Sequence, residues 1–99
     1  MTEYTRRIIE EISAIPKGKV SCYRDIAKRA GLPNGARQVV RVLHSMSEKY
    51  NLPWYRILRA DGSIALESGA GAELQAELLM NEGVTVSTGG KVDLEKYKV

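Results

Sequence analysis

The chain has 99 residues, of which 43% are apolar and 27% are charged, a composition typical of an ordinary globular protein. At this length we expect one domain, residues 1–99, with one modest core. No apolar run approaches the roughly 18 residues that a membrane-spanning helix needs, so no membrane partner is expected. The single cysteine, Cys22, excludes an internal disulfide and favours a reducing compartment, and a single histidine disfavours a zinc site. We therefore expect a cytoplasmic protein without a metal ion or other cofactor.

Charge is distributed unevenly along the chain. Residues 1–59 carry twelve Lys and Arg against five Asp and Glu, a difference of +7. Residues 60–99 carry three against seven, a difference of −4. A basic amino-terminal part favours a polyanionic partner. The alternative is a solvated charged surface without a binding role.

Apolar residues at helical spacing predict four helices. They cover residues 4–15, 21–30, 34–47 and 72–82. Pro16 ends the first helix and Gly83 the fourth, while Ser21 and Asn34 are expected to cap the second and third. The third helix is expected to turn one set of residues inward: Ala36, Val39, Val40, Leu43 and Met46.

Short segments with strand character follow the third helix. Residues 55–59 and 64–66 flank a turn and predict a β-hairpin, and 84–88 and 92–94 are expected to add small terminal strands. The second and third helices around a glycine-containing turn are typical of a helix-turn-helix, with the hairpin as its wing. We therefore expect a mostly α fold with small β-hairpins, a winged helix-turn-helix. Such helix pairs also occur in proteins that never touch DNA.

Arg37 opposes its local electrostatic field. It falls in the first turn of the third predicted helix, where a cation faces the positive end of the helix dipole at a cost of up to about 1 kcal/mol. A residue that breaks a local rule indicates a functional demand. The alternative is an exposed arginine paired with a nearby carboxylate.

The tetrad Pro53-Trp54-Tyr55-Arg56 resembles the Pro-Cys-His-Arg motif of the O6-alkylguanine-DNA alkyltransferases. Three further segments occur in that family's order: Ile-Pro-Lys-Gly-Lys-Val at 15–20, Ala-Arg-Gln-Val at 36–39 and Leu-Leu-x-x-Glu-Gly at 78–83. Trp54 stands where the family has its alkyl-accepting cysteine and Tyr55 where it has histidine. Together these segments cover essentially the whole chain, which resembles an alkyltransferase-like protein. The alternative for Trp54 alone is an ordinary buried tryptophan.

The resemblance implies recognition of a damaged base without chemistry. An indole is no nucleophile near neutral pH, and a phenol with a pKa of about 10 is a poor base there, so we expect no enzyme activity. The expected function is binding of O6-alkylguanine in duplex DNA by nucleotide flipping, which marks the lesion for nucleotide excision repair. The implied partners are double-stranded DNA containing alkylated guanine and nucleotide excision repair proteins. We expect a monomer, associated with the nucleoid if the source is bacterial.

The resemblance also assigns residues to the site. Around the alkylated base it places Pro53, Trp54, Tyr55, Ile57 and Glu67. At the DNA it places Tyr23, Ala36, Arg37, Gln38, Arg41 and Arg56. Further candidates for backbone contacts are Lys17, Lys19, Arg24, Lys28 and Arg59.

Individual roles follow from the same resemblance. Arg37 would enter the duplex and fill the gap left by the flipped nucleotide, while Tyr23 would lie against the adjacent phosphate. Glu82 would have a structural role and accept a hydrogen bond from the Tyr55 hydroxyl. Glu67 falls about where alkyltransferase-like proteins often carry arginine, and an anion beside a guanine edge would change which purines are preferred.

Three other classes of protein remain open. A plain winged-helix regulator would read sequence with the outer face of the third helix, for which Gln38, Arg41 and Ser45 are a thin set. An active alkyltransferase would have to use Cys22, which stands where the family usually has serine. A protein-interaction module would present its basic face to an acidic partner.

Overall fold

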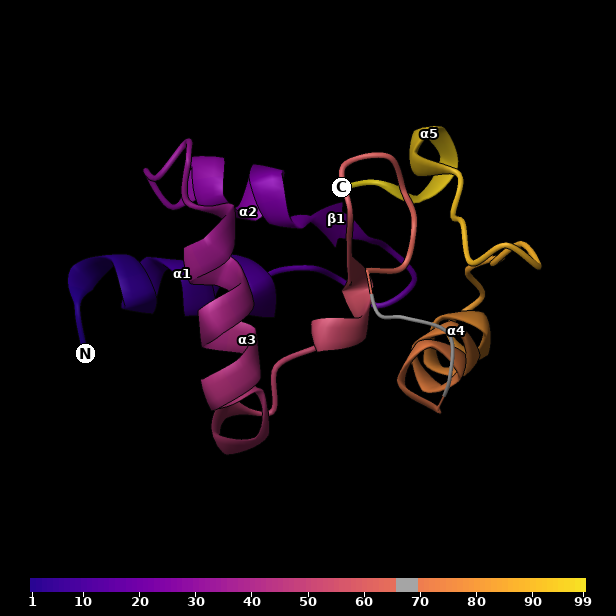
Figure 1. The fold of residues 1–99 in the computed structure, drawn as a ribbon, viewed down its shortest axis with the longest axis horizontal. Helices are drawn as coiled ribbons and strands as arrows, with labels where there is room; N and C mark the ends of the chain where they lie inside the picture. Colours follow the sequence, from indigo (N-terminus) through magenta and orange to yellow (C-terminus); the bar gives the residue numbers. More distant parts are fainter. Residues whose placement is uncertain (66–69) are drawn as a thin grey trace.

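The computed structural model describes residues 1–65 and 70–99 and is mostly helical, which confirms the predicted fold class. The elements in chain order are α1 (Glu3–Ser13), β1 (Ser21–Cys22), α2 (Tyr23–Arg29), α3 (Ala36–Tyr50), the 3₁₀ turn η1 (Trp54–Arg56), β2 (Ile57–Leu58), α4 (Ala70–Asn81) and α5 (Leu94–Tyr97). Helices α1, α2 and α3 form one half of the molecule, and α4 and α5 lie in the other (Figure 1). Within the described ranges no helix is long and apolar enough to cross a membrane.

A two-stranded parallel sheet joins the two halves. Ser21 pairs with Ile57 and Cys22 with Leu58. Because successive strand residues point to opposite faces, the two residues of β2 serve different cores. Ile57 belongs to the cluster made by α1, α2 and α3, whereas Leu58 packs with Leu79 of α4, and both are fully buried. The short strand therefore holds the two clusters together.

The connection between α2 and α3 depends on two glycines. Gly31 adopts a left-handed conformation (φ +87°) and ends α2, and the Leu32 N–H donates to the Ala27 carbonyl at 2.8 Å. A Cβ on Gly35 would lie 2.6 Å from the Leu32 Cβ, so this position has no room for a side chain. The tight turn sets α3 against α2 in the predicted helix-turn-helix arrangement.

Several predicted helix details are wrong. Ser21 does not cap α2, because it is buried in β1 and Cys22 takes the cap position. Gly35, not Asn34, is the N-cap of α3. Val39 is buried as predicted, but Val40 is 50% exposed and Val42, which was not predicted, is buried.

The predicted hairpin is also different. Residues 54–56 form η1, and the strand that follows pairs in parallel with β1 rather than with 64–66. Ile64 and Ala65 form no strand, and Leu66 lies outside the described residues. The chain after the turn instead reaches the carboxy-terminal segment, where the Ile64 N–H donates to the Gly90 carbonyl at 2.9 Å. Ile57 and Leu58 are both fully buried in different core clusters, so both faces of β2 are covered by packing that is distant in the sequence.

The carboxy-terminal segment contains a helix where strands were predicted. Residues 84–88 and 92–94 form no named strand, and α5 begins at Leu94. Asp93 caps it by accepting a hydrogen bond from the Glu95 N–H at 3.1 Å. Four residues are too few for helical periodicity to be visible in the sequence.

Candidate nucleic-acid interface

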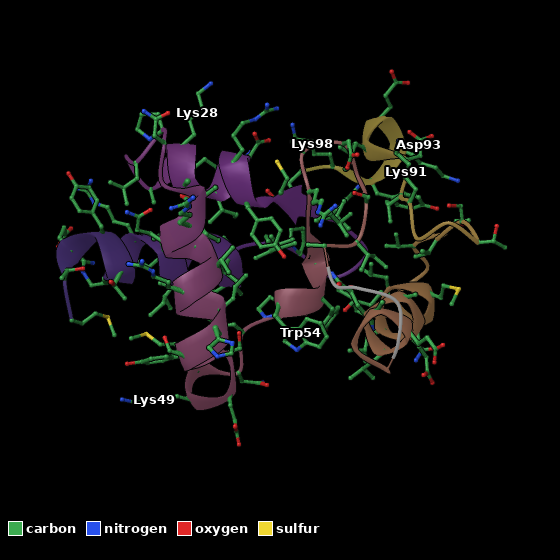
Figure 2. All side chains as sticks on the ribbon, in the orientation of Figure 1. Lys28, Lys49, Trp54, Lys91, Asp93 and Lys98 are labelled. Carbon is green, nitrogen blue, oxygen red and sulfur yellow. The ribbon has the colours of Figure 1, made fainter. Side chains whose placement is uncertain are left out.

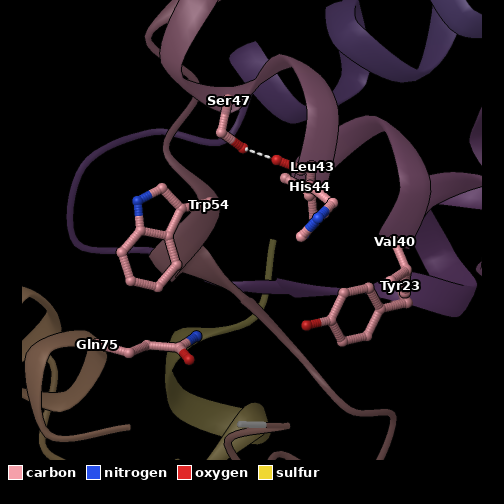
Figure 3. A pocket seen from close by; sticks show the side chains of 7 residues that line it. All are labelled: Tyr23, Val40, Leu43, His44, Ser47, Trp54 and Gln75. Carbon is pink, nitrogen blue, oxygen red and sulfur yellow. Dashed lines mark hydrogen bonds between the residues drawn. The ribbon is translucent and has the colours of Figure 1, made fainter. Parts of the chain in front are cut away.

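A cavity of about 360 Å³ opens where the two halves meet. Its walls come from α2, α3, η1 and α4. The lining residues are Tyr23, Val40, Leu43, His44, Ser47, Trp54 and Gln75. Figure 3 shows the hydroxyl of Tyr23 directed into the open space, with Trp54 on another side of it. The structure thus brings together two predicted site residues, Tyr23 and Trp54, which are 31 positions apart in the numbering.

Trp54 is half-buried and lines this cavity rather than a core cluster. It lies between α3 and α4 (Figure 2). Its backbone N–H donates to the Leu52 carbonyl at 2.8 Å, and its ring meets that of Tyr55 edge to face, with centroids 5.8 Å apart and an interplanar angle of 88°. The indole is therefore held at the surface of a hollow, not in the interior.

The other residues predicted for the base pocket lie elsewhere. Pro53 and Tyr55 line a separate hollow of about 460 Å³ on the far side of η1. Ile57 is fully buried in the first core cluster, because β2 turns its side chain away from the cavity, so its predicted place in the pocket is wrong. Glu67 lies outside the described residues.

Arg56 and Glu82 form a largely buried ion pair beside Trp54. Their side chains are 14% and 8% exposed. The Arg56 Nε donates to Glu82 Oε1 at 2.9 Å, Nη2 donates to Oε2, and Nη1 donates to the Ile15 carbonyl at 2.9 Å. The Gly18 N–H donates to Glu82 Oε1 at 3.2 Å. Arg56, which was expected at the DNA, is thus fully engaged inside the protein.

The Tyr55 hydroxyl completes this network. It donates to Glu82 Oε2 at 3.0 Å, which confirms the hydrogen bond expected from the sequence. Burial raises the pKa of Tyr55, and the hydrogen bond to the carboxylate raises it further. The hydrogen bond from Arg56 chiefly lowers the pKa of Glu82, against the opposing effect of burial. Tyr55 is therefore a protonated donor near neutral pH, and Glu82 is an ionised acceptor.

The amino-terminal part of α3 carries the predicted DNA-binding residues. Arg37, Gln38 and Arg41 are exposed, and Ala36 is half-buried. Among the described residues Arg37 takes part in no ion pair, so the alternative of a carboxylate partner finds no support there. Arg37 lies three residues before Val40, which places it on the side of α3 that borders the cavity.

Sequence reasoning missed the far wall of the cavity. Gln75 on α4 is 3% exposed, and its Nε2 donates to the Tyr55 and Ile57 carbonyls, both at 3.1 Å. The sequence does carry a signal for this residue. Gln75 lies four residues before Leu79, so the two share the helix face that packs against the core. His44 lines the cavity from an exposed position on α3, and Leu43 and Ser47 lie beside it.

Comparison with known proteins places the chain in a family. The model for the DNA-binding domain of 6-O-methylguanine DNA methyltransferases matches residues 3–84. The chain belongs to this family of alkyltransferase DNA-binding domains, and its near relatives are its alkyltransferase-like members. A DNA base-flipping protein of Vibrio parahaemolyticus is 43% identical over 99% of this chain and 97% of its own. One from Escherichia coli is 41% identical over 96% of this chain and 73% of its own.

Solved structures support the same assignment. The fission yeast (Schizosaccharomyces pombe) protein Atl1, in complex with damaged DNA containing O6-carboxymethylguanine, matches with a TM-score of 0.84 and 32% identity. The match covers 100% of this chain and 96% of that one. The Mycobacterium tuberculosis O6-methylguanine methyltransferase is 24% identical with a TM-score of 0.66, a likeness of fold.

The ion pair predicts a specific dependence of stability on pH. Glu82→Gln should lower the free energy of unfolding by about 3 kcal/mol at pH 7, because it leaves the Arg56 charge largely buried without its partner. The pKa of Glu82 is lowered from 4.5 by folding. Its contribution is therefore complete above that value and is lost as the pH falls below it. Denaturant unfolding of both proteins at several pH values should show a difference that narrows in acid.

Glu10→Gln is the matched control. Glu10 pairs with Arg6 on α1, but the two side chains are 60% and 56% exposed. Exposed pairs contribute about 0–1 kcal/mol, so this variant should unfold almost like the unmodified protein at every pH. Equal losses in the two variants would contradict a special role for the Arg56–Glu82 pair.

Proposed function

We propose that this protein recognises O6-alkylguanine in duplex DNA by flipping the damaged nucleotide into the cavity at Trp54, and that it transfers no alkyl group. The observation that carries the proposal is an indole in the wall of an open cavity, on a turn whose motif resembles that of the alkyl-accepting cysteine. A volume of about 360 Å³ falls in the usual range of small-ligand sites, roughly 300–1,000 Å³. The names of the base-flipping relatives, and the complex of the yeast relative with alkylated DNA, support it.

Arg37 and Tyr23 supply the flipping machinery in this proposal. The exposed Arg37 guanidinium enters the stack beside the cavity, where its planar group stacks on bases and donates to the orphaned partner base. Tyr23 stands at the first turn of α2 with its hydroxyl directed into the cavity, and in this proposal it lies against the phosphate next to the flipped nucleotide. Extruding a base costs a few kcal/mol, and less for a damaged one, so flipping itself favours the lesion.

Exposed cations on α2 and α3 hold the DNA backbone. Arg24, Lys28 and Arg41 are exposed and belong to none of the ion pairs that the described residues form. Each phosphate they neutralise contributes roughly −0.9 to the slope of log affinity against log salt. Arg56 is left out of this set, because its donors are bound to Glu82 and the Ile15 carbonyl.

The absence of transfer rests on three side chains. Trp54 has no nucleophilic atom at neutral pH. Tyr55 stands where the activating histidine would be, but burial raises its pKa and its hydroxyl donates to Glu82. Cys22 is 1% exposed in β1 and does not line the cavity, so it offers no alternative acceptor. The output is a persistently bound lesion in the cytoplasm, suited to hand-over to nucleotide excision repair.

Trp54→Ala should reduce the preference for damaged DNA more than the affinity for DNA in general. Loss of indole stacking is worth about 1–3 kcal/mol, or roughly 5- to 150-fold. Fluorescence anisotropy with matched duplexes, one with guanine and one with O6-methylguanine, measures both affinities, and Trp54→Phe should retain part of the preference. If the unmodified protein binds the two duplexes equally, the lesion function is wrong.

Arg37→Ala should weaken binding of the O6-methylguanine duplex by roughly 10- to 100-fold, about 1.4–2.8 kcal/mol, because the flipped state loses the group that fills the stack. The thermal midpoint should stay unchanged, since Arg37 is exposed. Arg6→Ala removes the same charge from α1 and serves as the control. Comparable weakening by both variants would indicate a purely electrostatic contribution and count against insertion.

The mass of the intact protein should not change after incubation with DNA containing O6-methylguanine. The same result is expected for Trp54→Cys, because Tyr55 provides no base for the new thiol. A gain of one methylene by the unmodified protein would show alkyl transfer and overturn the proposal. A gain by Trp54→Cys alone would mean that the cavity activates a thiol without histidine.

A further inference from the structure

The helix-turn-helix carries a single carboxylate among its basic residues. Residues 21–47 contain one acidic residue, Asp25, and the basic residues there are Arg24, Lys28, Arg29, Arg37 and Arg41. Asp25 lies in the first turn of α2, where the positive end of the helix dipole favours an anion. It also directly follows Arg24 and lies three residues before Lys28, the exposed cations proposed above to hold the DNA backbone. A charge that favours α2 as a helix therefore stands among the charges that would bind phosphate.

A lysine from the other end of the chain neutralises this carboxylate. The Lys98 Nζ lies 2.6 Å from Asp25 Oδ2, and the two side chains are 36% and 20% exposed (Figure 2). The hydrogen bond from Lys98 is the main cause that lowers the pKa of Asp25, so this carboxyl group is ionised near neutral pH. Asp25 and Lys98 thus form a partly shielded ion pair at the start of α2.

The pairing with Lys98 leaves the cations of α2 itself free. Residues three and four apart are neighbours on a helix surface, so Lys28 and Arg29 are both within reach of Asp25. Among the ion pairs that the described residues form, none joins Asp25 to Arg24, Lys28 or Arg29. The carboxylate is therefore neutralised without the use of a cation from the helix that would face the DNA.

The backbone holds Lys98 in place independently of its side chain. The Val20 N–H donates to the Tyr97 carbonyl at 3.0 Å, and the Val99 N–H donates to the Val20 carbonyl at 2.9 Å. These two bonds form a parallel bridge between Val20 and Lys98, which lays the end of the chain beside β1 (Figure 1). The side chain of Lys98 can therefore be changed while the bridge that positions it is kept.

We infer that Lys98 is a positioning residue for DNA binding, which acts by pairing with Asp25 so that Arg24 and Lys28 remain free for phosphates. This inference rests on the proposed function only for the contact of α2 with the DNA backbone, and it concerns affinity rather than preference for a lesion. Without Lys98 the carboxylate repels the nearest phosphate and turns to Lys28, which withdraws one cation from the DNA. One such charge at a protein surface changes affinity by roughly 2- to 5-fold.

Lys98→Met should weaken binding of the guanine and O6-methylguanine duplexes alike, by roughly 2- to 5-fold, and leave the ratio of the two affinities unchanged. The slope of log affinity against log salt should become less negative by up to about 0.9, because one phosphate contact is lost. Fluorescence anisotropy at several salt concentrations measures both quantities. Lys96→Met is the matched control, since it removes the same charge from an exposed position two residues earlier that joins no ion pair in the described part of the chain. Equal weakening by the two variants would overturn the inference.

Asp25→Asn separates neutralisation from structural support. It should lower the thermal midpoint, because α2 loses a favourable anion in its first turn, and yet bind both duplexes at least as tightly as the unmodified protein. In the Asp25→Asn background, Lys98→Met should weaken binding no more than Lys96→Met does. An undiminished effect of Lys98→Met in that background would show that Lys98 does not act through Asp25, and would overturn the inference. So would a lower thermal midpoint of Lys98→Met with unchanged affinities and salt slope, which indicates a structural role alone. Equal affinities of the unmodified protein for the two duplexes would instead overturn the lesion function and leave this inference standing.

Discussion

The ion pair between Arg56 and Glu82 fixes the turn on which the site is built. Arg56 ends η1, which Trp54 begins, and Glu82 follows the end of α4. The same two side chains also bind the loop after α1. Arg56 donates a hydrogen bond to the Ile15 carbonyl, and Glu82 accepts one from the Gly18 N–H. One hydrogen-bond network thus joins three segments that are distant in the sequence, and it includes η1, the turn that carries Trp54. A buried ion pair seldom stabilises a protein more than an apolar replacement would. Its main effect here is therefore to fix the position of η1.

The cavity stands at the junction of two small cores, and contacts with both cores hold the η1–β2 side of it. Ile57 and Leu58 point to opposite faces of β2 and enter different clusters, so the backbone between them cannot shift without disturbing both. Gln75 binds the carbonyls on either side of Arg56 and adds a second constraint on the same turn. A pocket held in this way keeps its shape before a ligand arrives. Binding then carries little cost of reorganisation, which suits recognition in the absence of chemistry.

The sequence predicted the helices, whose apolar residues recur at helical spacing, and the site residues that belong to a recognisable motif. It located α1, α2, α3 and α4 and singled out Arg37, Trp54 and the Tyr55–Glu82 hydrogen bond. It failed where a partner distant in the sequence decides the outcome. Arg56 was predicted to contact DNA, but in the structure it pairs with the Glu82 carboxylate, which is 26 residues away in the sequence. The strand partner of Ile57 and the hydrogen bonds that Gln75 donates to η1 and β2 depend in the same way on contacts that periodicity does not encode.

Trp54 is the single tryptophan of the chain, so intrinsic fluorescence reports on the cavity wall alone. The direct test is a titration of the protein with matched duplexes containing guanine or O6-methylguanine, with indole emission and the anisotropy of labelled DNA followed together. A flipped base stacked on the ring should quench the emission with the damaged duplex, at the same concentrations at which anisotropy shows binding, and much less with the undamaged one. Saturating binding of the damaged duplex with no difference in emission between the two would contradict the account.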